Sequence, residues 1–447
     1  MALNNIKPPS AADIAQMWQA SGLKDKIIFT LMMVVAFRFC AQIPIYGVNN
    51  AVFQNIAAGN NIIGFLDLFS GGALGKVSMV ALGIGPYITA QIIVQLVSVV
   101  IPSLEKLQKE EGEAGRRKLA QYTRIFTVVL AVFQAIIFMI FMSHLPAAII
   151  PGIPYSMFFI SSVTALTAGS VLVMWLSELI TEHGIGNGGS LIIFVGIISG
   201  IPLYSQRTSE LVTQDPSLQF GLFALLSIFF ATMVLIVIMQ EAMRKVIIVN
   251  PKRQVGNKVY GGVNTYIPFK LNPGGVMPII FAIAILLFPS TILSVLGQAN
   301  LPGALGSFVL TMNKIFSPSG ATYYIIYFTL IVLLTFFYAS IMPNMQPKEI
   351  ANNLKKYGSS IPGIKPGKPT CDALDRILSR VTFIGAIALG IIALVPSFTS
   401  YLTHITTVQG IGATSLIIMV GVALDLINQV RTHLLAKNYE SFLKDKE

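Results

Sequence analysis

The chain has 447 residues, of which 54% are hydrophobic and only 11% carry a charge. Soluble domains carry about 25% charged residues, so this composition excludes an ordinary soluble protein and indicates a polytopic membrane protein. The two cysteines, Cys40 and Cys371, fall on a predicted span and a predicted loop, which predicts neither a disulfide framework nor a metal site.

Residues 1–26 are polar and lack the short apolar core and small-residue cleavage site of a signal peptide. We therefore expect a retained cytoplasmic segment, with a short amphipathic helix over residues 10–21 that Ser10 caps.

Apolar runs of membrane-spanning length predict an all-α polytopic protein with ten transmembrane helices. The fifth run is short, which leaves nine as the alternative count. Spans one to five form an N-terminal half over 27–206, spans six to ten a C-terminal half over 219–434, and 435–447 a cytoplasmic tail. The expected spans cover residues 27–46, 77–101, 125–145, 157–179, 190–206, 219–240, 276–297, 322–343, 381–401 and 411–434.

The basic residues fix the expected orientation. With a cytoplasmic N-terminus, 26 of the 30 Lys and Arg residues fall on the inner side, and only Arg38, Lys76, Arg207 and Lys314 do not. Because cytoplasmic segments are enriched in Lys and Arg, both termini are predicted to lie inside, which also supports an even number of spans.

Two long cytoplasmic loops cover residues 244–275 and 344–380. Patches rich in Val, Ile, Thr and Tyr predict that the first is a protruding β-hairpin, and Gly and Pro predict an ordered, turn-rich second loop. Their charges serve either topology and attraction to anionic lipids or the docking of a cytosolic partner, and their length favours docking. The docking candidates are Arg244, Lys245, Lys252, Arg253, Lys258, Lys348, Lys365 and Lys368.

The stretch from Phe65 to Ile88 begins with a half-length amphipathic piece, which breaks at Gly71 and Gly72. A full-length apolar helix is expected after Lys76. The short piece is either an interfacial helix in an external loop or a plug that lies within the protein. As a plug it would turn on a hinge at Gly71 and Gly72, and its charged residue Asp67 would face external water.

Two sequence echoes predict an inverted repeat. Pro86 and Pro278 lie in spans two and seven, each with isoleucine two residues later, while GIGNGGSLII (184–193) and GIGATSLII (410–418) open spans five and ten. Both echoes pair each span with the fifth one after it, in the opposite direction. This pattern indicates two inverted five-helix halves with a functional path at their interface.

The echoed positions are Ile84, Ile88, Ile193, Ile280 and Ile418. They either face lipid and core or form a hydrophobic constriction that excludes water. An ion-coupled transporter would place an ionisable group at mid-span, but the nearest candidate, Asp425, lies toward the cytoplasmic end. Arg38 either snorkels to the external surface or binds carbonyl groups of the plug or a loop. A secondary transporter and a lipid scramblase remain the alternative functions.

Several motifs then resemble one family over the whole chain. They are FLDLFSGGAL, ALGIGPYI, EGEAGRRKLAQYTR, MWLSELITEHGIGNGGSLIIF, NPGGVMPIIFA, PKEIANNLKKYGSSIPGIKPGKPT, GATSLII and NYE. In this order and spacing the chain resembles the SecY family, the channel subunits of bacterial protein translocases.

The resemblance implies an hourglass pore between the halves, through which unfolded polypeptides cross the membrane or pass sideways into it. It implies a pore ring of the five echoed isoleucines and a plug at about 62–76. The expected plug residues are Phe65, Leu66, Asp67, Leu68, Phe69, Ser70, Gly71 and Gly72. A lateral gate between spans two and seven would include Pro86, Gln91 and Pro278.

Implied partners are SecE-like and SecG-like small subunits, the ATPase SecA, the ribosome, signal peptides, nascent polypeptides and anionic lipids. The resemblance implies no enzymatic activity, no cofactor and no sequence-specific nucleic-acid binding. It implies a bacterial plasma membrane, with a thylakoid membrane as the alternative.

Three departures from the family pattern involve four positions. Lys365 stands where arginine is usual; it keeps the positive charge but lacks the bidentate fork of arginine. Gly189 occupies a ring position often filled by isoleucine, which leaves five apolar members in place of six. Cys40 and Tyr46 replace glycine and proline in span one without threatening the fold.

Overall fold

The computed structural model describes residues 22–50, 53, 67, 70–109, 112–145, 148–150, 152–250, 252–255, 258–262, 264–298, 304–316, 320–341, 346–403 and 413–444. The expected helix over 10–21, the plug residues Phe65, Leu66, Leu68 and Phe69, and the last residues of the tail lie outside this set.

A long helix coincides with each predicted span. Seven of the described helices are long and apolar enough to cross a membrane, and α5 and α11 include shorter apolar segments. The remaining helix, α2, has charged residues near both ends. The bounds are α2 Leu23–Cys40, α5 Gly85–Val100, α7 Gly112–Ser143, α8 Tyr155–His183, α9 Gly188–Gln214, α10 Gln219–Glu241, α11 Met277–Gln298, α13 Ala321–Ile341, α15 Lys368–Thr403 and α16 Ala413–Lys444.

The second helix begins later than predicted. Residues 71–84 form a series of turns, and α5 starts only at Gly85, so the expectation of a full-length helix after Lys76 is wrong. Gly83 has a φ of 57°, a left-handed conformation that ends any regular helix before it. The apolar run from 77 onward is buried as turns, not as helix.

Pro86 and Pro278 occupy equivalent places in the structure. Each is the second residue of its helix, α5 or α11, where a missing N–H costs nothing. Each helix also follows a glycine in the left-handed region, Gly83 or Gly275. The echoed prolines therefore lie at the starts of two helices. Sequence reasoning had placed them inside the two predicted spans.

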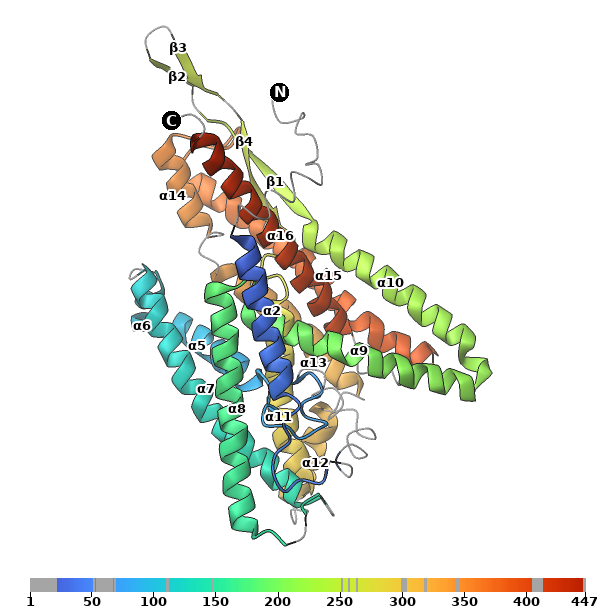
Figure 1. Cartoon of the computed structure of the whole chain (residues 1–447). Helices are drawn as coiled ribbons and strands as arrows, with labels where there is room; N and C mark the ends of the chain where they lie inside the picture. The colour runs from blue at the N-terminus through green and yellow to red at the C-terminus, as the bar shows by residue number, and fades with distance from the viewer. Residues whose placement is uncertain are drawn as a thin grey trace.

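The helices of each half contact one another, and some of them also contact helices of the other half (Figure 1). In the first, α7 contacts α5 and α8, and α8 contacts α2 and α9. In the second, α15 contacts α10 and α13, and α11 contacts α13. Between the halves, α9 contacts α16, and α5 and α7 contact α11.

The predicted hairpin is present and extends away from the helices (Figure 1). Its base is an antiparallel pair, β1 (Met243–Ile248) with β4 (Thr265–Lys270), in which Val246 lies opposite Ile267. Its tip is a second pair, β2 (Lys252–Val255) with β3 (Lys258–Gly261).

Four shorter helical segments complete the described fold: α6 (Pro102–Lys109), η1 (Pro216–Leu218), α12 (Ala304–Phe316) and α14 (Pro347–Tyr357). α14 lies in the loop predicted to be turn-rich. Its first residue is Pro347, and its last residue is followed by Gly358, which has a φ of 70°. Proline at the start and left-handed glycine after the end are ordinary helix boundaries.

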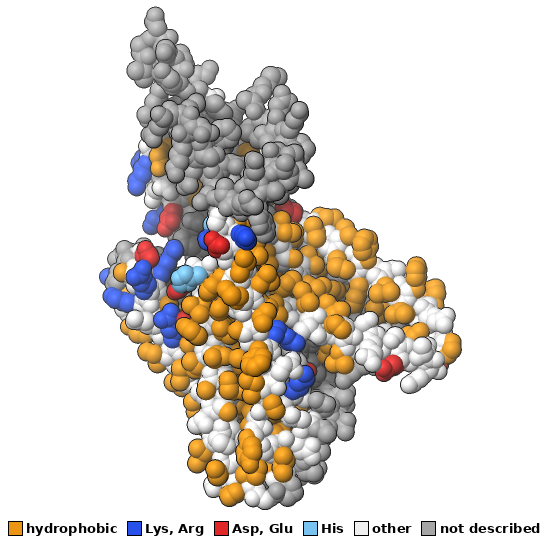
Figure 2. Space-filling view, in the orientation of Figure 1, with side chains coloured by type: hydrophobic (Ala, Val, Ile, Leu, Met, Phe, Trp, Pro, Cys, Tyr) orange, Lys and Arg blue, Asp and Glu red, His pale blue; other side chains and the backbone are white. Residues whose placement is uncertain are grey.

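The distribution of surface residues is that of a membrane protein. Figure 2 shows hydrophobic side chains over most of the described surface in that view, while most of the visible Lys and Arg side chains gather in its upper part, toward the hairpin end. A broad apolar surface of this kind needs lipid or another apolar partner to cover it.

Candidate functional site

The structure brings the five echoed isoleucines into one buried cluster. Ile84 precedes α5, and the others come from α5, α9, α11 and α16. None is more than 8% exposed, and all belong to a cluster that includes residues of both halves. The cluster also contains many other buried residues of both halves, so a ring formed by these five side chains is still a prediction. The exposed fractions are 2% for Ile84, 8% for Ile88, 1% for Ile193, 4% for Ile280 and 0% for Ile418.

Gly189 lies beside this cluster. A Cβ atom built on Gly189 would be 3.5 Å from Cδ1 of Ile84 and 3.3 Å from Oδ1 of Asn187. Asn187 caps α9, because its side chain accepts a hydrogen bond from the amide of Ser190. The glycine thus adjoins Ile84 without adding a side chain there.

A hydrogen-bonded turn between Asp67 and Gly75 lies within the predicted plug. The Asp67 carboxylate accepts a hydrogen bond from the Gly75 amide at 2.6 Å, and the Gly72 amide donates to the Asp67 carbonyl at 2.9 Å. The Ser70 hydroxyl accepts from the Leu74 amide at 2.9 Å. The placement of Asp67 in external water is still a prediction; the structure adds that its carboxylate and carbonyl groups hold this turn together.

Gly71 and Gly72 belong to the same turn. Their φ values of 70° and 81° lie in the left-handed region, where residues with a Cβ atom are disfavoured. A Cβ atom on Gly71 would lie 3.0 Å from both the Arg38 guanidinium and the Gly196 Cα. Gly71 therefore allows close packing here, whereas a Cβ atom on Gly72 would meet no atom within 4 Å. A hinge at this place is still a prediction.

Arg38 binds this turn. Its half-buried guanidinium, on α2, donates to the Gly71 carbonyl and, at 2.9 Å, to the Ser199 hydroxyl on α9. Of the two alternatives for Arg38, the contact with a carbonyl is the one observed. An isolated arginine in an apolar helix was the signal for it, but nothing in the sequence pointed to Ser199.

The predicted lateral-gate residues lie on α5 and α11, two helices that contact each other. Pro86 and Pro278 are buried and Gln91 is half-buried. Sequence reasoning missed an aromatic contact between α7 and α11. The ring centroids of Phe133 and Phe288 are 6.2 Å apart. Their spacing along the chain gives no sign of it.

Asp425 lies on α16, away from the isoleucine cluster. Its Oδ2 atom is 3.8 Å from the Cβ position of Gly275, and its side chain is exposed. Four residues later, Gln429 accepts a hydrogen bond at 2.8 Å from the Gly186 amide of the other half. The carboxylate is thus outside the buried interface of the halves.

The two loops predicted to be cytoplasmic, 244–275 and 344–380, form one body, which we call the cytoplasmic body. Val246 and Phe269 of the hairpin share a buried cluster with Ile361, Leu374 and Leu378 of the second loop and α15. The backbones of Val249 and Ser360 exchange two hydrogen bonds, and the Ser359 hydroxyl donates to Asn250 Oδ1 at 2.7 Å. Sequence reasoning treated the loops as separate surfaces.

The docking candidates are spread over this cytoplasmic body. Arg244 and Lys245 are on β1, three others are on β2 and β3, Lys348 is on α14, and Lys365 and Lys368 flank the start of α15. Where the structure describes their side chains, these residues are exposed. Lys245 also lies over the Tyr266 ring, with its Nζ atom 5.0 Å from the centroid.

Metal-binding chemistry has no support in the described part of the chain. No group of three or more His, Cys, Asp or Glu residues there could hold an ion, and Cys40 and Cys371 are free thiols.

Comparison with known proteins agrees with this architecture. The chain is 44% identical to the protein translocase subunit SecY of Synechococcus elongatus over 454 aligned positions, which cover 100% of both chains. Three solved structures each align with 92% of this chain and 92% of their own. One is described as a protein-conducting channel (18% identity, TM-score 0.65), and one as a SecY protein whose plug domain stabilises the closed state (17%, 0.63). The third is Sec61 in a canine ribosome–channel complex (17%, 0.59).

The family assignment has a second, independent basis. The SecY family model matches residues 78–427, which include the five echoed isoleucines, both loops predicted to be cytoplasmic, and the helices from α5 to α15. The chain therefore belongs to the SecY family.

Proposed function

We propose that this protein is the channel through which unfolded secretory polypeptides cross a membrane, and from which apolar segments enter the bilayer. The observation that supports the proposal is the buried cluster of residues from both halves, to which Ile84, Ile88, Ile193, Ile280 and Ile418 all belong. A closed apolar constriction excludes water and ions, yet its flexible side chains can separate for a large substrate.

The turn beside this constriction supports a plug. In the proposal, the segment around Asp67 to Gly72 closes the external side of the path, and Arg38 holds it there through the Gly71 carbonyl. A signal sequence enters between α5 and α11 and favours the open state, because burial of its apolar core stabilises it by roughly 0.8 kcal/mol per CH2 group.

The energy for transport comes from a partner. SecA or a ribosome docks on the cytoplasmic body, and SecE-like and SecG-like subunits cover part of the apolar surface. A relative of the same fold, Sec61, was solved within a ribosome–channel complex, which supports the ribosome as one such partner. The net charge of +11 favours encounter with negatively charged surfaces.

The protein is a multi-pass membrane protein. We place it in a bacterial plasma membrane with both termini cytoplasmic, because 26 of 30 basic residues then lie inside. A thylakoid membrane is the alternative location.

Reconstitution tests the proposed function directly. The full chain with a SecE-like subunit in proteoliposomes, given SecA, ATP and a preprotein, is expected to make the preprotein resistant to added protease. No protection, while a known channel works in parallel, would overturn the proposal. Uptake of a small solute driven by an ion gradient would favour a secondary transporter instead.

Replacing Arg38 by methionine should loosen the plug. The variant keeps the apolar stem but removes the donor to the Gly71 carbonyl and to Ser199. A hydrogen bond to a charged group contributes about 1.5–3 kcal/mol, so the closed state should lose up to about a hundredfold in population. Ion conductance of resting channels in planar bilayers measures this. Ser199→Ala, which removes only the second acceptor, should have a smaller effect, and equal conductance in all three proteins would contradict the role of Arg38.

Reversing charge on the cytoplasmic body should weaken partner binding. We expect Lys252→Glu, Arg253→Glu and Lys365→Glu together to reduce the affinity for SecA or ribosomes by at least about tenfold at low salt, with a smaller reduction at high salt. Sedimentation with vesicles that contain the protein measures the binding. The control pair Arg207→Glu and Lys314→Glu, predicted on the opposite side, should leave it unchanged. Unchanged affinity in the first variant would restrict those charges to a topological role.

A further inference from the structure

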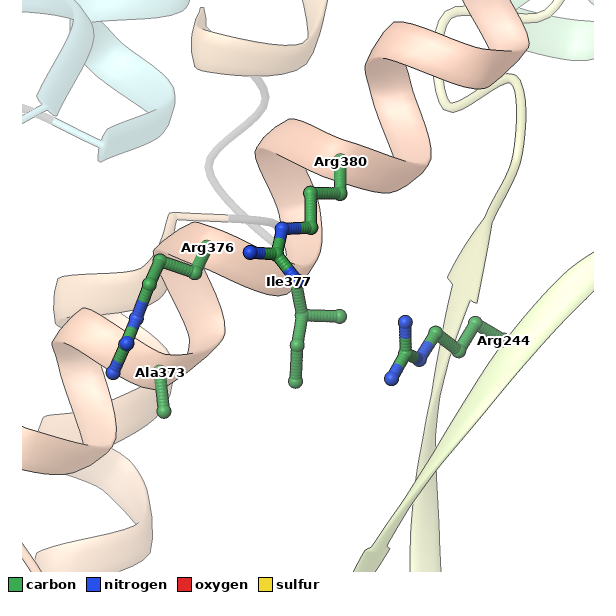
Figure 3. A pocket seen from close by; sticks show the side chains of 5 residues that line it. All are labelled: Arg244, Ala373, Arg376, Ile377 and Arg380. Atoms are coloured by element: carbon green, nitrogen blue, oxygen red, sulfur yellow. The ribbon is translucent and has the colours of Figure 1, made fainter.

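Three arginines surround an open cleft at the base of the hairpin (Figure 3). Arg244 comes from β1, and Arg376 and Arg380 come from α15, one helical turn apart. Ala373 and Ile377 complete the lining, and the cleft has a volume of about 210 Å³. Arg244 was grouped with the docking residues of the hairpin, but the other two arginines lie beside it only in the folded protein.

These guanidinium groups lack a neutralising carboxylate in the described part of the chain. The ion pairs found there join Arg117 with Glu113 and Arg124 with Glu178. Arg376 uses its Nε to donate to the Asp372 backbone carbonyl at 3.2 Å. Like charges four residues apart on a helix repel each other, so Arg376 and Arg380 make a locally unfavourable pair that a bound anion would stabilise.

The exposed face of α15 changes from charged to apolar directly after Arg380. Phe383 and Ile384 follow Arg380 by three and four positions, so they lie on the same helix face, and they are 53% and 60% exposed. Ile391, two turns further, is 53% exposed. A cationic cleft therefore lies directly above an exposed apolar stripe, at the start of an apolar stretch long enough to span a bilayer.

We propose that this cleft binds the phosphate headgroup of an anionic phospholipid. Guanidinium groups bind phosphate through paired, charge-assisted hydrogen bonds, and basic pockets at the cytoplasmic ends of membrane helices suit such headgroups. The acyl chains of the lipid lie along Phe383 and Ile384. A docking protein or ribosome would use the charges but not the apolar stripe, which is why the lipid is the better occupant. Binding at this cleft does not depend on transport activity.

Native mass spectrometry of the full chain in detergent tests the proposal. Short-chain phosphatidylglycerol is titrated against phosphatidylcholine of the same chain length and, separately, against inorganic phosphate. We expect phosphatidylglycerol to bind at concentrations at which the other two do not. The variant Arg376→Gln with Arg380→Gln should weaken that binding at least tenfold, since each lost charge-assisted contact is expected to weaken affinity by about that factor.

Two controls make the result decisive. Lys355→Gln with Lys356→Gln removes the same charge from exposed positions on α14 and should leave phosphatidylglycerol binding unchanged. Arg380→Lys keeps the charge and should retain part of the affinity, which separates binding from folding. Equal loss in both double variants, equal binding of phosphatidylcholine, or inorganic phosphate binding as tightly as the lipid would each overturn the proposal.

Discussion

Replacing Gly169 with alanine is expected to prevent the N-terminal half from packing. Gly169 is buried on α8, and an added Cβ atom would lie 2.0 Å from the Met79 carbonyl oxygen and 2.6 Å from its carbon. Both are backbone atoms of the turns before α5, so a side-chain movement cannot relieve the contact. Overpacking costs about 1–3 kcal/mol of folding free energy in ordinary cores. Because the added Cβ atom would overlap backbone atoms, we expect a cost at or above the upper end of this range.

The measurement is the yield of monodisperse protein in detergent and its midpoint of thermal unfolding. Gly85→Ala is the matched control, because a Cβ atom at Gly85 meets no atom within 4 Å and alanine favours the helix that begins there. Wild-type stability in Gly169→Ala would show that the turns can separate from α8, contrary to the packing described.

Serine in place of Ile88 and Ile280 is expected to make the resting channel leak ions. Both side chains are almost completely buried in the cluster shared by the two halves. Hydroxyl groups there bind water, which removes the dewetted barrier, so we expect resting conductance to rise by about an order of magnitude or more. Electrical recording from planar bilayers gives the conductance directly.

Loss of packing alone must be separated from this effect. Ile180→Ser with Ile331→Ser makes the same chemical change at two fully buried positions of the same cluster, on α8 and α13. Removing a buried isoleucine side chain costs about 2–5 kcal/mol, so both double variants lose stability. Only the first should raise conductance, and equal leakage in both would remove Ile88 and Ile280 from the constriction.

Hydropathy predicted the helices well, and it failed where an apolar sequence folds without a helix. The run from Val77 to Ile84 is as apolar as a span, but it forms buried turns. Pro86 could have indicated where the helix begins, because proline is favoured in the first turn of a helix. Similarly, Pro347 and Gly358 mark the ends of α14, although their loop was predicted to consist of turns.

Interactions between distant segments were predicted in kind but not in detail. Alternation of residue types predicted the hairpin, and the repeat predicted that isoleucines of both halves converge. For Arg38 the sequence left two alternatives, and the structure shows the contact with a carbonyl, that of Gly71, while Ser199 carries no local signal. The joining of the two cytoplasmic loops depends on tertiary packing, and no period in the sequence encodes it.

The contact between the two loops determines how late in synthesis this part of the protein can assemble. Asn250 and Ser359 are 109 positions apart, and α11 and α13 lie between them. Chains are made from the N-terminus, so the hairpin emerges long before the segment that holds its base. Val246 and Phe269 therefore stay partly uncovered until α15 has been translated. A nascent chain that stops earlier cannot present the assembled cytoplasmic body, which needs the chain to have been made at least as far as Leu378.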